Sequence, residues 1–130
     1  MTDEEVKRHM VEHRLDDARA VLKDACFLLE NNGSSQGVVN LAYNSMFYAV
    51  LALLQKIEAV PSKNSRALGL FDQEYVRPGK IDCSFSVDIH KAFELRLLSN
   101  YGTTIVSGDV ARDLVERAQA FIEAAEKLLD

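Results

Sequence analysis

The sequence is poor in the residues that build disulfide-rich, zinc-ribbon and loop-rich proteins. It has no tryptophan, two prolines, two cysteines and six glycines among 130 residues. Cys26 and Cys83 lie far apart and form no C-x-x-C pair, so their spacing indicates neither a zinc site nor a disulfide scaffold. We therefore expect free thiols in a reducing, cytoplasmic environment.

The sequence also shows neither the apolar stretch of a signal peptide at its start nor a long apolar run, so we expect no secretory leader. The first residues, MTDEEVKRH, are acidic and polar, unlike a signal peptide. The most apolar run, residues 41–54, is interrupted by Asn44 and Ser45 and is shorter than the ~20 residues that span a bilayer. We expect no membrane contact and a buried core helix at this run.

Acidic side chains outnumber basic ones, which argues against a generally basic nucleic-acid-binding surface. The chain carries 15 Lys and Arg against 20 Asp and Glu, for a formal net charge of −5. The negative charge is unevenly distributed along the chain, because residues 56–96 contain seven basic and six acidic side chains while both flanking segments are acidic. Only this middle segment, which includes Lys63, Arg66 and Arg96, offers a place that would attract a phosphate or another anion. The same side chains are also ordinary for solvated connecting segments.

Hydrophobic residues make up 48% of the chain and recur at helical spacing wherever the pattern is clear. A capping box of Thr2 and Glu5 predicts the start of a first helix, which Asn31-Asn32-Gly33 ends. Ser34 or Ser35 caps a second helix that reaches about Glu58. This second helix is apolar on most faces, so we expect it to be central.

The rest of the chain predicts three more helical segments. They are a short helix over residues 62–75, a helix over residues 86–100 with Gly102 as its cap, and a last helix that begins after Ser107. No stretch alternates as a half-buried strand does. The sequence therefore predicts an all-α antiparallel bundle of four long helices with an additional short helix, in a single domain over residues 1–130.

Motifs for metal and cofactor chemistry are weak. Residues 9–13 spell H-x-x-E-H, the inverted zincin pattern, with His9 and His13 one helical turn apart. A third ligand and a substrate cleft are not evident, and Lys7, Arg8 and Arg14 are unfavourable neighbours for a cation, so a polar helix surface explains the pattern better. Glycine-rich phosphate loops are also missing. We expect neither a bound metal nor a cofactor.

Polar side chains interrupt the apolar surface of the second helix. They are Asn40, Tyr43, Asn44 and Tyr48, and three of them are spaced by four residues and share a face. Buried amides and hydroxyls need hydrogen-bond partners. The pattern fits a core network, a dimer seam or the wall of a binding pocket.

A second polar group ends the fourth long helix. Arg96 and Asn100 are one turn apart, and Tyr101 follows. Arg96 has the fork geometry to bind a phosphate, and Tyr101 could donate a hydrogen bond or a proton. From the residues alone, a structural ion pair for Arg96 and a packed helix cap at Tyr101 are the favoured interpretation.

Three blocks of the chain together resemble the HEPN superfamily, and more closely a small prokaryotic branch of it. The blocks are the helix LAYNSMFYAVLALL at residues 41–54, the segment PSKNSRALGLFDQEYVRPGKI at residues 61–81, and RLLSNYG at residues 96–102, followed by the Ser107-capped helix. The resemblance covers most of the chain in the right order. It implies a helical bundle that often forms homodimers.

Many members of the superfamily that this chain resembles are metal-independent ribonuclease toxins, or are encoded beside a minimal nucleotidyltransferase that acts as their antitoxin. Their ribonuclease motif is an Arg followed, after four to six residues, by a His, and two such motifs meet at the dimer cleft. On this chain the resemblance assigns Arg96 to the Arg and Tyr101 to the His position, with Asn100 where the branch usually has Asp. A phenol is a poor base near neutral pH, which weakens the expectation of ribonuclease activity. The tyrosine that antitoxins modify in related toxins corresponds to Thr103.

Three hypotheses follow from the sequence. The first is a HEPN-like homodimer that works with a nucleotidyltransferase partner, with Arg96, Asn100 and Tyr101 lining a shared cleft for RNA or a nucleotide. The second is a metal-independent ribonuclease that uses Arg96 and Tyr101. The third is a non-catalytic helical interaction module. Further candidate binding residues are Asn40, Tyr43, Asn44, Tyr48, Lys63 and Arg66.

Overall fold

The computed structural model describes residues 1–102 and 105–130, and all regular secondary structure within these ranges is helical. The elements are α1 (Asp3–Glu30), α2 (Ser35–Lys56), the 3-10 helix η1 (Asn64–Arg66), α3 (Ala67–Phe71), the π-helix η2 (Asp72–Val76), α4 (Cys83–Tyr101) and α5 (Gly108–Leu129). The all-α prediction is confirmed.

Helix α1 begins at the predicted capping box. Thr2 Oγ1 accepts a hydrogen bond from the backbone N–H of Glu5 (3.1 Å) and donates one to Glu5 Oε1 (3.2 Å). The helix ends where predicted, and Asn32 takes the left-handed conformation with a φ of 58°. The backbone N–H of Gly33 then donates to the carbonyl of Leu28 (2.7 Å), which turns the chain toward α2.

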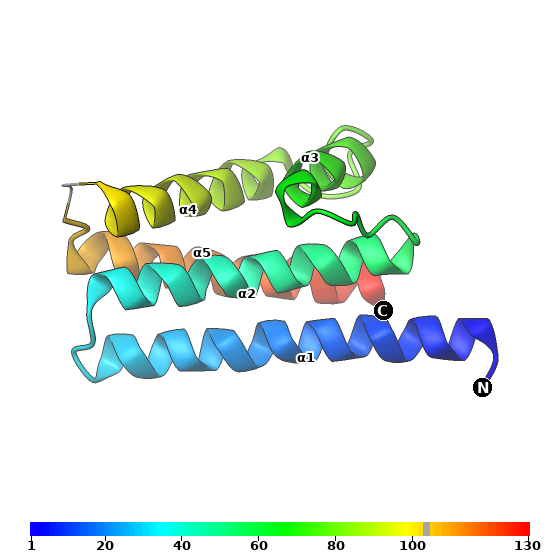
Figure 1. Ribbon diagram of the computed structural model, residues 1–130, viewed down its shortest axis with the longest axis horizontal. Coiled ribbons are helices and arrows are strands. Elements are labelled where there is room, and N and C mark those ends of the chain that lie inside the picture. The colour runs from blue at the N-terminus through cyan, green and yellow to red at the C-terminus, as the bar shows by residue number, and fades with distance from the viewer. Residues whose placement is uncertain (103–104) are drawn as a thin grey trace.

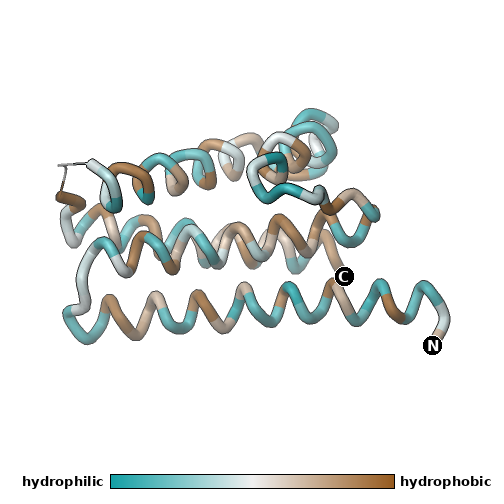
Figure 2. Tube along the Cα trace, viewed as in Figure 1, coloured by the Kyte–Doolittle hydropathy of each residue, from teal (hydrophilic) through white to brown (hydrophobic). Residues whose placement is uncertain are grey.

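Helix α2 is central, as its apolar faces predict. Ser34 caps it by accepting a hydrogen bond from the N–H of Gly37 (3.0 Å). The helix packs against α1, α3, α4 and α5, and Figure 1 shows it between α1 and α4 with α5 behind. Hydrophobic residues recur along each long helix (Figure 2), and residues from all five α-helices contribute to one core cluster.

By length and composition, α2 could also cross a membrane, and it is the one helix within the described ranges that could. Buried residues make up 67% of its most apolar stretch, however. Its apolar surface is therefore covered by the other helices of the bundle, as the sequence predicts for a core helix.

The predicted short helix over residues 62–75 is three consecutive pieces, η1, α3 and η2. Its apolar residues anchor it to the bundle. Phe71 and Tyr75 are buried, with ring centres 6.3 Å apart, and the Tyr75 hydroxyl donates to the carbonyl of Leu53 on α2 (2.6 Å). The segment is thereby held over one end of α2.

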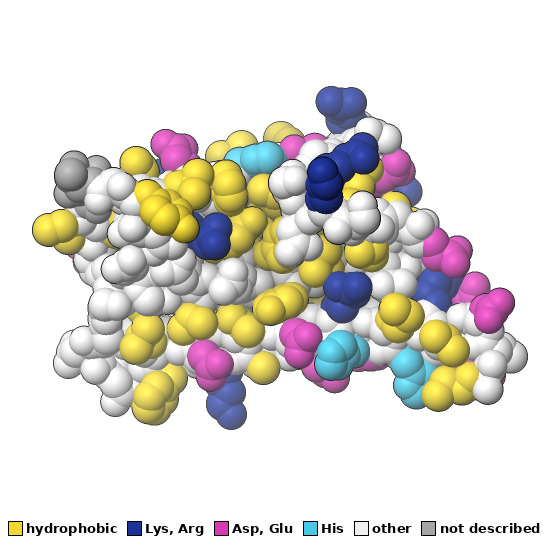
Figure 3. Space-filling view, viewed as in Figure 1, with side chains coloured by type: hydrophobic (Ala, Val, Ile, Leu, Met, Phe, Trp, Pro, Cys, Tyr) yellow, Lys and Arg dark blue, Asp and Glu magenta, His cyan; other side chains and the backbone are white. Residues whose placement is uncertain are grey.

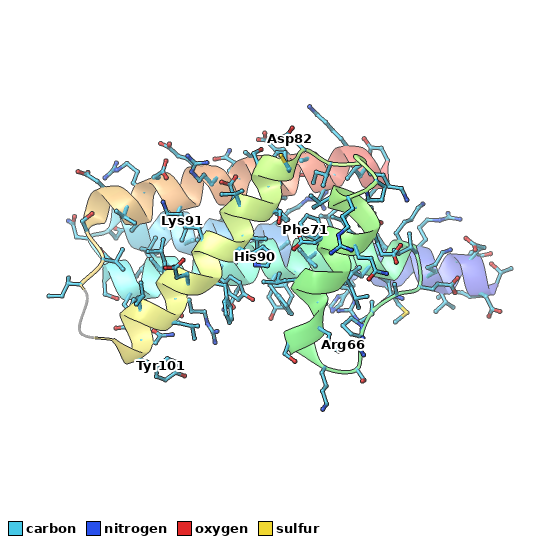
Figure 4. The ribbon with its side chains drawn as sticks, turned by 90° about the horizontal axis from the view of Figure 1, so that it is seen from above. Arg66, Phe71, Asp82, His90, Lys91 and Tyr101 are labelled. Atoms are coloured by element: carbon cyan, nitrogen blue, oxygen red, sulfur yellow. The ribbon has the colours of Figure 1, made fainter. Side chains whose placement is uncertain are left out.

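Helix α4 begins three residues before the predicted position, because Asp82 supplies the cap. Its carboxylate accepts a hydrogen bond from the N–H of Ser84 (3.1 Å). At the other end, the N–H of Gly102 donates to the carbonyl of Leu98 (3.0 Å), as expected for a cap. Figure 4 shows α4 running obliquely across the bundle from Asp82 to Tyr101, with α3 beside its first half.

Candidate functional site

Side chains from α2, η1 and α4 surround a hollow on one face of the bundle. We call it the Arg96 hollow; its volume is about 330 Å³. Its lining residues are Tyr43, Asn44, Phe47, Tyr48, Leu51, Asn64, Ser65, Phe93 and Arg96. Figure 3 shows this face, with hydrophobic side chains in the recess between α4 and the α3 segment and basic side chains around it.

Arg96 lies against an aromatic ring in this hollow. Its guanidinium carbon is 5.5 Å from the ring centre of Tyr43, a cation–π arrangement. Tyr43 is itself buried, and its ring centre lies 6.0 Å from that of Phe47 and 5.7 Å from that of Phe93. The aromatic cluster therefore positions the guanidinium at the wall of the hollow.

No ion pair in the described part of the chain involves Arg96. The structural ion-pair role that the sequence allowed is thus not what holds this side chain. An arginine that is positioned by a ring and keeps its fork of donors is suited to an external anion such as a phosphate.

The hollow has little capacity for proton transfer. None of its described lining residues is a histidine or a carboxylate. Burial raises the pKa of the Tyr43 phenol, and the charge of Arg96 opposes part of that rise. Because Tyr43 stays protonated near neutral pH, the site can donate hydrogen bonds, stack rings and attract an anion, but it holds no ready general base.

Three of the six candidate binding residues from the sequence line the hollow: Tyr43, Asn44 and Tyr48. Lys63 and Arg66 flank or end η1 and are exposed beside the lining residues Asn64 and Ser65. Sequence reasoning missed Phe93. Its position three residues before Arg96, on the same side of a helix, is the signal that would have identified it.

Asn40 has a different role from its neighbours. Its Nδ2 donates to Oδ1 of Asn100 (3.0 Å), and Nδ2 of Asn100 donates to Oδ1 of Asn40 (2.9 Å). Gln36 Nε2 also donates to Oδ1 of Asn100 (2.8 Å). This amide network connects α2 to the end of α4, so the structure places both asparagines in an interhelical contact outside the Arg96 hollow.

Tyr101 does not join the hollow within one chain. The residue is 80% exposed, and Figure 4 shows its side chain pointing away from the bundle. Tyr101 lies five positions after Arg96 in α4, which turns the two side chains about 140° apart around the helix axis. Thr103, the position of the modified tyrosine in related toxins, lies outside the described residues.

A second hollow, of about 390 Å³, lies between α1 and α2. We call it the α1 hollow; its lining residues are His9, Met10, His13, Arg14, Asp17 and Tyr48. Both histidines of the H-x-x-E-H pattern are therefore on this surface. Residues 1–102 and 105–130 contain no cluster of three or more histidine, cysteine or acidic side chains that could hold a metal.

Other titratable and nucleophilic side chains lie outside both hollows. The carboxylate of Asp72 accepts a hydrogen bond from Ser86 Oγ (2.6 Å) and lies 2.7 Å from Nε2 of His90. These contacts connect η2 to α4.

The two cysteines differ in exposure. Cys26 is half-buried, and burial raises the pKa of its thiol, with Glu30 adding to the rise. Cys83 is exposed. Both cysteines are free thiols, as predicted.

Comparison with known proteins finds one domain family and several relatives that are similar to this chain. The family model described as HEPN domain matches residues 11–128. The chain is 32% identical over 125 residues to a UPF0332 protein of Thermotoga maritima, an alignment that covers 95% of this chain and 94% of the relative.

Two archaeal relatives come from Methanocaldococcus jannaschii, and both carry the name "putative toxin". One is 32% identical over 92 residues, which cover 70% of this chain and 63% of the relative. The other is 25% identical over 122 residues, which cover 94% of this chain and 90% of the relative.

Proposed function

The chain belongs to the HEPN domain family, and from this premise we propose that it is a toxin-like HEPN module whose Arg96 hollow binds a nucleotide unit of RNA. The module acts in the cytoplasm together with a minimal nucleotidyltransferase partner. The names of the two archaeal relatives support the toxin-like role. The resemblance of the chain to toxins encoded beside nucleotidyltransferases motivates the partner.

The observation that carries the proposal is the placement of Arg96 over the ring of Tyr43, in a hollow without acidic lining residues. A nucleotide combines a phosphate with a flat ring. Arg96 supplies the charge for the phosphate, while Phe47, Tyr48 and Phe93 supply faces and edges for the base. Asn44 and Asn64 add amide groups that can hydrogen bond to the edge of a base.

We propose a homodimer that forms through the outer face of α4. Leu97 is 39% exposed and Phe93 is 37% exposed, and Tyr101 continues the same line at a spacing of four residues. An exposed apolar stripe of this kind is suited to burial against a second copy. Such contact would bring two Arg96 hollows close together, in the way that the family resemblance implies.

The geometry favours binding over ribonuclease chemistry within one chain. Their spacing of five residues turns Arg96 and Tyr101 about 140° apart around α4, and Tyr101 is largely exposed. Cleavage by this pair would require Tyr101 to reach the hollow of a second copy. Measurements of RNA binding and cleavage can distinguish this proposal from a ribonuclease and from a purely structural interaction module.

The decisive experiment measures binding of a fluorescein-labelled, mixed-sequence hexaribonucleotide by fluorescence anisotropy. Arg96→Gln should weaken binding about tenfold, which corresponds to about 1.4 kcal/mol. Lys91→Gln is the matched control, because Lys91 is an exposed basic residue of α4 that lines a separate hollow between α4 and α5. Equal affinities for the parent and Arg96→Gln would contradict the proposed site.

Separate measurements test the remaining parts of the proposal. Cleavage of the hexamer that is lost in both Arg96→Gln and Tyr101→Phe would favour the ribonuclease. Light scattering at micromolar concentration should report a dimer, and Leu97→Glu should shift it toward monomer. A nucleotidyltransferase encoded beside this protein should copurify with it after coexpression; failure to copurify would count against the partner.

A further inference from the structure

The Arg96 hollow and the α1 hollow meet at one side chain. Tyr48 lines both of them, so the two hollows are neighbours on the surface of α2. The volumes, about 330 and 390 Å³, each fall at the lower end of the range of ~300–1,000 Å³ typical of small-ligand sites. A mononucleotide would occupy one of them, whereas a chain of linked nucleotides would extend into both.

The lining of the α1 hollow is suited to a phosphodiester backbone. Arg14 is positioned by a hydrogen bond from its Nε to Oε1 of Gln55 (3.2 Å) on α2. A guanidinium has five N–H donors, so this contact uses one and leaves four for a ligand. His9 and His13 lie one helical turn apart on the same wall and add imidazole groups.

One acidic side chain lies in this hollow, beside one of its two histidines. The carboxylate of Asp17 lies 3.5 Å from Nε2 of His13, and the two side chains are 45% and 77% exposed, respectively. Asp17 is the single acidic residue among the described lining residues, which also include two histidines and Arg14. Among these lining residues, the Arg14 guanidinium is the permanent positive charge available to a phosphate.

We infer that the α1 hollow is a second subsite for single-stranded RNA, in which Arg14, His9 and His13 bind the backbone phosphate next to the nucleotide held at Arg96. This inference rests on the proposed function of the Arg96 hollow and adds the path of the chain beyond it. Tyr48 lies between the subsites and presents its ring to the linked nucleotides. Single-stranded RNA is the fitting form, because its unstacked bases can lie against aromatic side chains such as Tyr48.

The test uses 5′-phosphorylated oligouridylates of one, two and three nucleotides as competitors of the labelled hexamer. In the parent protein, affinity should rise with length. Arg14→Gln and His13→Gln should each weaken binding of the trinucleotide about tenfold and change binding of the mononucleotide less than twofold. Lys23→Gln, which removes an exposed charge of α1 outside both hollows, should leave both affinities unchanged.

Salt dependence supplies an independent readout. For single strands, each phosphate contact contributes about 0.7 to the slope of log affinity against log salt concentration. Arg14→Gln should therefore reduce the slope for the trinucleotide by about 0.7 and leave the slope for the mononucleotide unchanged. His9→Gln is a second variant on the same wall of the α1 hollow, for the same measurement. Equal thermal midpoints of the parent and all variants show that the fold is intact.

The outcomes separate this inference from the proposed function. If Arg96→Gln weakens all three ligands while Arg14→Gln and His13→Gln bind the trinucleotide as the parent does, the second subsite is wrong and the Arg96 site stands. The second subsite is also wrong if the α1 variants weaken the mononucleotide and the trinucleotide equally. If Arg96→Gln leaves mononucleotide binding unchanged, the proposed function itself fails.

Discussion

The side-chain amides of Asn40 and Asn100 hydrogen bond to each other in both directions, at 3.0 and 2.9 Å. Each amide acts as donor and acceptor, and Asn40 also donates to the backbone carbonyl of Gln36 (3.0 Å). The pair fastens the end of α4 to α2, close in sequence to Arg96. Its geometry makes Asn100 sensitive to a change that removes its donor.

Asn100→Asp should destabilise the fold by about 1–2 kcal/mol at neutral pH. The substitution replaces the Nδ2 donor with a carboxylate oxygen that faces Oδ1 of Asn40, so an attractive contact becomes a repulsive one. Stability should partly return in acid, where the new carboxyl is protonated and can donate again. Urea unfolding at pH 7 and pH 4 measures the effect relative to the parent, and equal losses at the two pH values would contradict this explanation.

Tyr75→Phe should cost about 1 kcal/mol of unfolding free energy. The variant keeps the buried ring but loses the hydrogen bond from the hydroxyl to the carbonyl of Leu53, 2.6 Å away. Tyr101→Phe makes the same chemical change on a side chain that is 80% exposed, so it should stay within 0.5 kcal/mol of the parent by the same urea measurement. Similar effects of the two substitutions would contradict a specific role for the Tyr75 contact.

Alkaline pH should destabilise the protein through its buried phenols. Burial raises the pKa of Tyr75 and of Tyr43; Glu74 adds to the rise at Tyr75, and Arg96 opposes it at Tyr43. Above the ordinary tyrosine pKa near 10, the unfolded chain loses these protons while the folded chain retains them. Ionisation of these two groups therefore leaves the unfolding free energy unchanged well below pH 10 and lowers it as the pH rises above 10.

Chemical denaturation between pH 8 and pH 11 measures this dependence. The double variant Tyr43→Phe, Tyr75→Phe starts from lower stability but should lose less of it over the same range, because it has fewer shifted groups. A parallel decline in the parent and the double variant would assign the alkaline loss to other residues.

Two glycines should respond to alanine in opposite directions. At Gly33, a Cβ would clash with the side chain of Leu28 and lie 2.9 Å from its carbonyl oxygen, so Gly33→Ala should cost about 1–3 kcal/mol. At Gly69 in α3, nothing lies within 4 Å of the added atom, and Gly69→Ala should stabilise by about 0.5–1 kcal/mol. Thermal midpoints of both variants distinguish the expected signs.

Local signals predicted the helix boundaries well. The Thr2, Ser34 and Ser107 caps were all readable, because a cap is decided by residues within three positions of one another. The predicted start of α4 is three residues too late, although Asp82 caps this helix through an equally local contact. The π-helical turn in η2 was not predictable, because it accompanies the packing of Phe71 and Tyr75 against distant helices.

Helical periodicity and capping act over one or two turns, so they are enough to predict the all-α fold, the central place of α2 and the short set of polar side chains around Arg96. How that set divides depends on contacts between helices. Arg96, Tyr43, Asn44 and Tyr48 line one hollow, while Asn40 and Asn100 pair with each other. The division depends on the oblique crossing of α4 over α2, which is set by side-chain packing between segments far apart in the chain.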